Sequence, residues 1–307
     1  MLTRPDVLVL GAGGVLGEAW MTGVLAGIEE ATGFDLRRCE AFVGTSAGAI
    51  VAAQLAAGQS PRRPGRTPVE REAPEERPVD GLAAAALTAA RWAGAFALNA
   101  AAAFAPLALG AAAPGGALMR GAMLRRLPRP RSTLGALRDN IERSGARFDG
   151  RLRVVAVDRR SGRRVVFGSP GAPRASVADA VTASCTVPWL FAPVQIGERE
   201  YVDGGVWSPT NLDAAPAGRD THVLCLHPMA NIVGSHPLLA MIRRVGRSAV
   251  SLEALAVRRR GAVVQWVAPD PEAAAAMGSN FMDRAPRARV LAAGFHQGLD
   301  AARRGLR

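Results

Sequence analysis

Lysine is absent from this chain of 307 residues, and aromatic side chains are scarce. All 38 basic residues are therefore arginines, and with 26 acidic residues they give a net charge of +12. Such a charge favours contact with phosphate groups of nucleic acid or anionic lipid, although a coding bias toward arginine would produce the same composition. Because only 5% of residues are aromatic, the stacking platforms of a single-strand nucleic-acid binder are missing. No helix-turn-helix or zinc-finger spacing occurs either, so we expect no nucleic-acid partner.

Cysteine is also sparse. Cys39, Cys185 and Cys225 are odd in number, far apart and outside any CxxC pair. They predict reduced, buried thiols and a cytoplasmic protein. The apolar run near the N-terminus enters a glycine turn too early for a signal peptide. No cluster of His, Cys, Asp or Glu has the spacing of metal ligands, so the sequence predicts no metal and no cofactor.

Two strand–turn–helix units open the chain. The apolar run Val7 to Leu10 predicts a strand covered on both faces, followed by the loop "GAGGVLG" and a helix over 18–31. A second strand over 40–44, a sharp turn and a helix over 47–57 repeat the plan. Two such units favour an α/β fold of three layers with a mostly parallel central sheet. Residues 151–169 predict a hairpin, and "VQIGEREYVD", "THVLCLHP" and "AVVQWVAP" predict further strands.

The middle of the chain differs in composition. Residues 59–81 are rich in proline and charge, which predicts a flexible surface insertion. Residues 82–131 begin as an alanine-rich stretch and end in five arginines, which predicts an apolar helical cap or a membrane-contacting segment. Residues 92–113 are long enough to span a bilayer, but Asn99 and Pro106 interrupt them. We expect one domain over 1–307 that carries this region as an insertion.

The stretch Gly44-Thr45-Ser46-Ala47-Gly48 carries the clearest chemistry. A GxSxG pattern at a strand-to-helix junction is typical of a nucleophile elbow, which holds the serine hydroxyl exposed on a tight turn. Gly44 and Gly48 are small enough for the close approach that this turn requires. The N-terminus of the following helix favours negative charge at the serine. The structural alternative is a tight turn that only packs a helix onto a strand.

A nucleophilic serine needs a base. The order of Ser46, Asp203 and His296 fits the triad of an α/β-hydrolase, but only one complete strand–helix unit precedes Ser46, whereas that fold has several. His296 falls within the pattern of the last helix, which favours a structural or surface role. His227 ends a predicted strand and is the better-placed spare candidate. Asp203 is followed by Gly204, so a hairpin turn is the alternative interpretation of this aspartate.

The first glycine loop, residues 11–17, resembles a dinucleotide fingerprint. However, Leu16 stands where the third glycine or alanine is expected, and the lysine of a phosphate-binding loop is missing. The backbone amides of Gly13, Gly14 and Val15 can instead line a concavity at a helix N-terminus. Such a concavity is suited to an oxyanion hole.

Together, the glycine loop, the GTSAG turn and the Asp-Gly-Gly at 203–205 resemble the patatin-like phospholipase family. "VADAVTASCTVPWLFAPVQIGEREYVDGG" is similar to the family's stretch before its catalytic aspartate, and "VVAVDRRSGRRVVF" to its central hairpin. The resemblance covers residues 1–58 and 150–307. It implies a dyad without histidine, in which Ser46 is the nucleophile and Asp203 the general base, with an oxyanion hole from Gly13, Gly14 and Val15. Leu16 departs from the family, which usually has Arg or Lys there.

The resemblance implies a lipid acyl hydrolase, of phospholipase A or lysophospholipase type, that cleaves carboxylic esters through an acyl-enzyme and needs no cofactor. The alternatives are a general esterase, thioesterase or acyltransferase with the same dyad, a catalytically weak membrane-associated protein of the same fold, and a nucleotide-binding protein. The apolar residues 82–119 and the arginines of 120–131 favour a lipid presented at an anionic membrane surface. A peripheral position at the inner face of the membrane would suit this, and the oligomeric state is left open.

Overall fold

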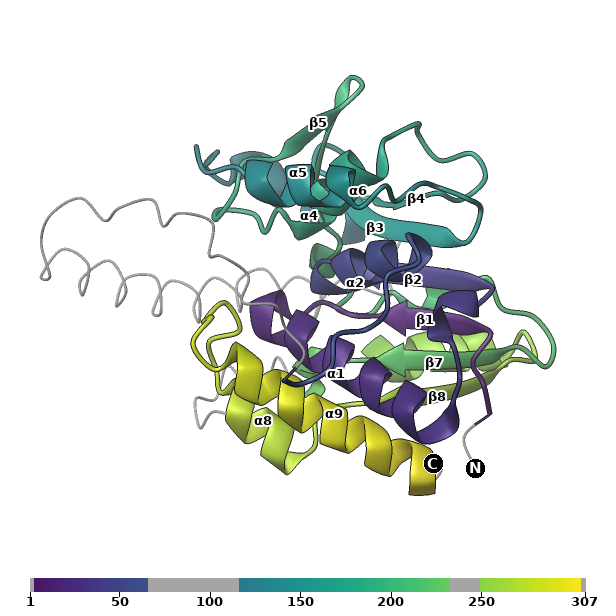
Figure 1. Cartoon of the computed structure of the whole chain (residues 1–307). Coiled ribbons are helices and arrows are strands. Elements are labelled where there is room, and N and C mark those ends of the chain that lie inside the picture. Colours follow the sequence, from purple (N-terminus) through teal and green to yellow (C-terminus); the bar gives the residue numbers. More distant parts are fainter. Residues whose placement is uncertain (1–2, 66–115, 232–248, 305–307) are drawn as a thin grey trace, which may run out of the picture.

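The computed structural model describes residues 3–65, 116–231 and 249–304 (Figure 1). Residues 66–115, which hold most of the predicted insertion and the bilayer-length stretch 92–113, lie outside the described residues. The predictions of a flexible insertion, an apolar cap and a single domain therefore stay predictions. Within the three described ranges, no helix is long and apolar enough to cross a membrane.

In the part of the chain that the structure describes, one sheet of eight strands forms the centre (Figure 1). Five neighbouring strands are parallel, in the order β3-β2-β1-β7-β8, while β4, β5 and β6 join antiparallel around β3. The prediction of a mostly parallel central sheet is therefore confirmed, and β3 and β4 form the predicted hairpin. The strands are β1 (Val7–Leu10), β2 (Ala41–Thr45), β3 (Leu152–Asp158), β4 (Arg164–Phe167), β5 (Val194–Ile196), β6 (Arg199–Asp203), β7 (His222–Leu226) and β8 (Val263–Val267).

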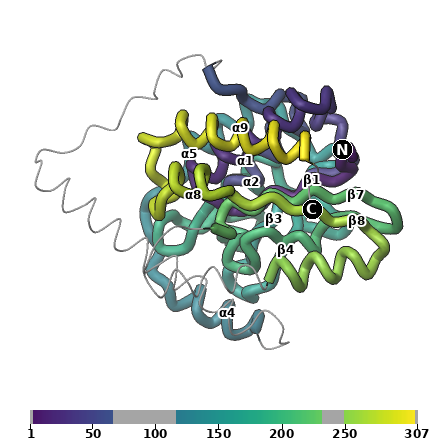
Figure 2. Tube along the Cα trace, turned by 90° about the horizontal axis from the view of Figure 1, so that it is seen from below, coloured from purple at the N-terminus to yellow at the C-terminus, as the bar shows by residue number. Residues whose placement is uncertain are grey.

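Helices cover both faces of the sheet, which confirms the predicted three layers. α1, α2 and α9 lie on one side, and α4 and the helical residues 249–258 lie on the other (Figure 2). The helices with defined bounds are α1 (Gly14–Thr32), α2 (Ala47–Ala56), α4 (Gly116–Arg126), α5 (Gly135–Arg143), α6 (Val177–Cys185), α8 (Pro271–Met277) and α9 (Arg287–Arg304). α1 starts four residues before its predicted beginning, because the second half of the glycine loop already forms its first turn.

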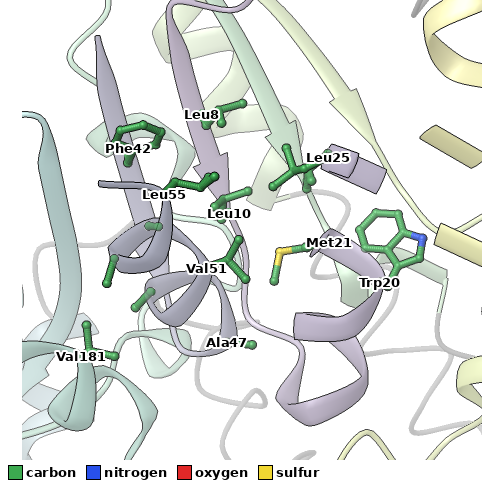
Figure 3. Close-up of a cluster of buried hydrophobic side chains, with 14 of the residues drawn as sticks. Leu8, Leu10, Trp20, Met21, Leu25, Phe42, Ala47, Val51, Leu55 and Val181 are labelled. Atoms are coloured by element: carbon green, nitrogen blue, oxygen red, sulfur yellow. The ribbon is translucent and has the colours of Figure 1, made fainter. Parts of the chain in front are cut away.

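The main core lies between the sheet and the layer of α1 and α2 (Figure 3). Leu8 and Leu10 of β1 point into it, together with Phe42 of β2 and Val51 of α2. The alternate residues of β1 pack on the opposite face against the helical residues 249–258. Both faces of the central strands are thus buried, which explains why their sequences are continuously apolar.

Two strands share one edge of β3, and this arrangement positions the site. β2 pairs with β3 as far as Thr45 opposite Val155, and β6 takes over with Asp203 opposite Ala156. Because β4 occupies the other edge of β3, β2 and β6 must lie along the same edge. β2 runs parallel to β3 and β6 antiparallel, so their carboxyl ends meet end to end. Ser46, the next residue of β2, is thereby brought to Asp203.

Candidate active site

Ser46 occupies a strained turn between β2 and α2. Its φ of 53° and ψ of −122° lie in a region that residues with a side chain rarely adopt. The flanking glycines permit the turn: a Cβ on Gly48 would lie 1.9 Å from the carbonyl oxygen of Leu10, and a Cβ on Gly44 would lie 2.4 Å from the Cα of Ala49. The serine side chain stands at the N-terminus of α2, as the sequence predicts. This geometry suits a nucleophile, and the residue is largely buried, with 8% exposed.

Asp203 lies beside Ser46, and the serine side chain is close enough to the carboxyl group to affect its pKa. The carboxyl group is buried, with 4% of the residue exposed, and its Oδ1 accepts a hydrogen bond from the Gly205 amide at 2.7 Å. The chain continues from Asp203 into a 3-10 turn, Gly204–Val206, so the hairpin-turn interpretation of Asp203-Gly204 is wrong.

Burial raises the pKa of Asp203 to about 7, although the Ser46 side chain and the Gly205 amide act in the opposite direction. Desolvation penalises the charged carboxylate more than the two donors stabilise it. A carboxylate with a pKa near neutrality is far more basic than an ordinary aspartate. It can therefore accept a proton from a hydroxyl group at physiological pH.

The end of α6 braces both residues. The Ser46 amide donates to Ser184 Oγ at 2.9 Å, and that hydroxyl donates to the Val155 carbonyl at 2.6 Å. The Asp203 amide donates to the carbonyl of Thr186 at 3.0 Å. The backbone of the nucleophile and that of the aspartate are thus both tied to the start of one loop, residues 184–186.

Cys185 contacts the site directly. It is partly accessible, so the prediction of three buried cysteines is wrong for this residue, while Cys39 and Cys225 are buried. Its thiol lies close to the Ser46 side chain and to the Asp203 carboxylate. Desolvation, with a smaller contribution from that carboxylate, raises the pKa of the thiol well above its usual value. The Cys185 side chain therefore lines the site as an uncharged thiol and is a poor nucleophile.

A buried polar loop, residues 208–212, lies behind the pair. The side-chain amide of Asn211 donates to Thr45 Oγ1 at 3.1 Å and to the Ser208 carbonyl at 2.7 Å. Glu253 anchors the same loop by accepting hydrogen bonds from the Thr210 hydroxyl and the Leu212 amide. These residues are not predicted from the sequence. Asn211 and Thr210 stand in an irregular segment where no periodicity or motif marks them.

The glycine loop lies next to the elbow, because Leu10 of β1 pairs with Gly44 of β2. The amides of Gly13, Gly14 and Val15 donate to no acceptor within the described part of the chain, whereas the Ala12 amide donates to the Pro209 carbonyl. Gly14 has a φ of +58°, and a Cβ there would lie 2.7 Å from the carbonyl oxygen of Phe281. Free amides at the start of a helix form the kind of donor group that an oxyanion requires.

Leu16 is fully buried in the core beneath this loop. Its amide donates to the Phe281 carbonyl at 3.1 Å, and the side chain of Pro228 packs against Gly13 and Gly17. The loop is thus supported by apolar packing and by the segment around Phe281. This support replaces any that a charged side chain at position 16 would give.

The histidines lie apart from this pair. His227 follows β7 and is buried, but β1 separates β7 from β2 in the sheet, which puts roughly 10 Å between the two strands. His296 lies within α9, where it is exposed and has its ring near Phe295, as the expected structural or surface role predicts. His222 is the first residue of β7, whereas Ser46 follows the last residue of β2. Since both strands run parallel to β1, the two residues lie at opposite ends of the strands. His236 lies outside the described residues.

A cavity of about 290 Å³ lies between α1, α2 and α5 and is lined by Thr22, Gln54 and Asn140, among others. It borders the last turns of α2, whereas Ser46 precedes the first turn, so it is separate from the candidate site. No three or more His, Cys, Asp or Glu side chains of residues 3–65, 116–231 and 249–304 are grouped so as to hold a metal ion.

Comparison with known proteins gives a family match and two similar structures. The sequence profile described as patatin-like phospholipase matches residues 8–216, more than half of the chain. No curated protein sequence matches. The solved structure of VipD from Legionella pneumophila has 14% sequence identity and a TM-score of 0.44, and the match covers 98% of this chain and 67% of that one. The type III effector protein ExoU has 16% identity and a TM-score of 0.41, with 99% of this chain and 54% of that one covered.

Proposed function

Because the chain belongs to the patatin-like phospholipase family, we propose that it is a lipid acyl hydrolase in which Ser46 and Asp203 cleave carboxylic esters. The observation that carries the proposal is the close approach of the Ser46 side chain, on its strained turn, to the buried Asp203 carboxyl group. Family membership supports a lipid ester as the substrate. The paired side chains support a dyad without histidine.

The proposed reaction begins when Asp203 accepts the proton of Ser46 Oγ as that oxygen attacks the ester carbonyl carbon. The amides of Gly13, Gly14 and Val15 stabilise the resulting oxyanion, and each good donor in comparable sites contributes about 3–4 kcal/mol. The tetrahedral intermediate collapses, and the departing alcohol takes its proton from Asp203. Asp203 then takes a proton from water as the water oxygen attacks the acyl-enzyme. When this second tetrahedral intermediate collapses, Asp203 returns the proton to Ser46 Oγ and a carboxylic acid is released.

Two measurements test this function. We expect a fluorophosphonate to add once to the intact protein, and we expect free fatty acid to be released from phospholipid or lysophospholipid. Activity on lysophospholipid alone would identify a lysophospholipase. Turnover of short soluble esters or thioesters without any release from lipids would favour the esterase or thioesterase alternative. If the folded protein neither reacts with the probe nor hydrolyses lipid in vesicles, the proposed enzyme is excluded.

We further propose that the substrate is presented at an anionic membrane and that the face around α4 contacts it. Leu118 and Met119 on α4 are 74% and 60% exposed. Arg125 and Arg126 follow in the last turn, and Arg160 lies beside them, because the Arg125 guanidinium donates to its carbonyl. Exposed apolar residues flanked by arginines suit insertion among anionic head groups.

This face is close to the proposed site. Leu124 of α4 packs against Val202 of β6 and Val206, which flank Asp203 in the sequence. α4 also packs closely on the β3–β4 turn, where a Cβ on Gly162 would lie 2.2 Å from the Ala117 carbonyl oxygen. The exposed residues of α4 therefore stand on a rigid support next to the strand that carries the base.

The double substitution Leu118→Asp and Met119→Asp tests the membrane contact. We expect hydrolysis of vesicles containing anionic phospholipid to fall by about tenfold or more, because two exposed apolar side chains that would insert into the membrane are replaced by negative charges that anionic head groups repel. Hydrolysis of a short soluble ester should be unchanged. Leu252→Asp with Leu255→Asp, on the helical residues 249–258, is the matched control, since these side chains are 62% and 44% exposed. Equal losses in both variants would contradict a contact through α4.

A further inference from the structure

Asn211 holds a position that joins the two strand ends of the proposed site. It is completely buried, with 0% exposed, and its backbone is left-handed at a φ of 50°. Its Nδ2 lies 3.1 Å from Thr45 Oγ1, 2.7 Å from the Ser208 carbonyl oxygen and 3.4 Å from the Gly204 carbonyl oxygen. Thr45 immediately precedes Ser46, and Gly204 immediately follows Asp203. One amide group therefore contacts the neighbour of each proposed catalytic residue.

The contact matters because the ends of β2 and β6 meet along β3 without pairing with each other. Each of these strands is hydrogen-bonded to β3, and no β2–β6 pairing occurs in the described sheet. Ladder hydrogen bonds therefore cannot fix the separation of Ser46 from Asp203 directly. A side chain that bonds across the junction can do so, and Asn211 is placed across it.

The orientation of the Asn211 amide is itself fixed. Its Oδ1 accepts a hydrogen bond from Arg164 at 3.3 Å, and Arg164 also makes a bidentate pair with Asp213. An arginine has only donors to offer, so the oxygen of the Asn211 side chain faces it and the NH₂ group faces Thr45. The backbone N–H of Asn211 donates a hydrogen bond to Ser208 Oγ. On either side of Asn211, the Thr210 hydroxyl and the Leu212 backbone N–H donate to the Glu253 carboxyl group.

We infer that Asn211 is a positioning residue that sets the distance between Ser46 and Asp203 by bonding to Thr45 and to the carbonyl of Gly204. This inference rests on the proposed function and names a residue that acts through its neighbours, without contact to substrate. Loss of the bridge leaves both reacting side chains present but allows their separation to vary. Misplacement by about 1 Å can cost about 100-fold in rate.

The test uses two substitutions at Asn211. Asn211→Asp keeps the shape but replaces the donor by an oxygen that faces two carbonyl groups, and the adjacent Arg164 balances its charge. Asn211→Gly removes the side chain while glycine tolerates the left-handed backbone. We expect kcat on a soluble ester to fall by about 10- to 100-fold in each, with KM within about twofold of wild type and a parallel fall in the rate of fluorophosphonate labelling.

Thr210→Val provides the matched control in the same loop. It removes the hydrogen bond to Glu253 but leaves the contacts of Asn211 with Thr45 and Gly204. We expect a lower Tm and a kcat within about twofold of wild type. Thr45→Ser should retain activity, whereas Thr45→Val should reduce it. The double variant Thr45→Val with Asn211→Gly should be no less active than the less active of the two single variants, because both substitutions remove the same Asn211–Thr45 hydrogen bond.

The outcomes separate the two proposals. An inactive, unlabelled wild type would overturn the proposed function. If the wild type is active, two results would overturn the positioning role. One is that the Asn211 variants have a lower Tm but an unchanged kcat, and the other is that Thr210→Val lowers kcat as much as they do. A selective fall in kcat at Asn211, together with activity that is kept with serine and reduced with valine at Thr45, would support it.

Discussion

Replacing Ser46 by alanine is expected to abolish fluorophosphonate labelling and to reduce ester hydrolysis by at least about 10⁴-fold. Comparable losses accompany removal of the nucleophile in other serine hydrolases, because no other group forms the acyl-enzyme. Cys185 touches Ser46 but cannot substitute for it, since desolvation keeps its thiol protonated. Intact-mass labelling and steady-state hydrolysis measure the two effects on the same sample.

Asp203→Asn should give a loss of about 10³- to 10⁴-fold, because the amide retains the shape of the carboxyl group but cannot accept the serine proton. Substitution of His227 by asparagine is the control for a histidine base. We expect this variant to be labelled like wild type if it is folded, as judged by its thermal transition. Labelling that is lost with His227 and kept with Asp203→Asn would contradict the dyad and favour a histidine-based mechanism.

The activity on a soluble ester should depend on pH with a midpoint near 7. The pKa of Asp203 is raised to about 7 by burial, and the base must be deprotonated to accept the serine proton. The value of kcat/KM should therefore rise tenfold per pH unit below about pH 7 and be level above it. Cys185, the titratable group against the pair, has a pKa raised well above its usual value and stays neutral over this range. A midpoint near pH 4 would mean that Asp203 is hydrated in solution.

The same pKa makes Asp203 costly to the fold at high pH. In the unfolded chain its pKa is close to 3.8, and in the folded protein it is about 7, so the folded state holds the proton more tightly. The free energy of unfolding should therefore fall as pH rises from about 4 to about 7, by on the order of 4 kcal/mol in total. Asp203→Asn removes this effect. We expect it to melt at a higher temperature than wild type at pH 8 and to lose that advantage near pH 4, as thermal unfolding at both pH values would reveal.

The sequence predicted the parts of the site that are local in the chain. The elbow at Ser46 follows from small residues between a strand and a helix, and the glycine loop follows from the same junction one unit earlier. Asp203 was selected through the family resemblance, since an Asp-Gly pair by itself suggests a turn. What brings Asp203 to Ser46 is the exchange of β2 for β6 along β3, which depends on pairing between distant segments.

The residues that support the site were beyond sequence reasoning for a related reason. Ser184, Thr186 and Asn211 act through single hydrogen bonds to backbone or hydroxyl groups far away in the chain. Such contacts leave no periodic pattern. Leu16 was noted as a departure from the family, but only the fold reveals that it is a core residue and that the Phe281 segment supports the loop.

The end-to-end meeting of β2 and β6 also has a consequence for the order in which the protein folds. The unit formed by β1, α1 and β2 is local, and it already contains the serine and the glycine loop. The aspartate arrives only after β3 has paired with β2 over a separation of about a hundred residues and β6 has then joined β3. Because long-range pairings close slowly, we expect hydrolytic competence to be among the last properties that the folding chain acquires. A nascent or partly folded chain would then carry its proposed nucleophile without a base, and we expect it not to hydrolyse lipids until folding is complete.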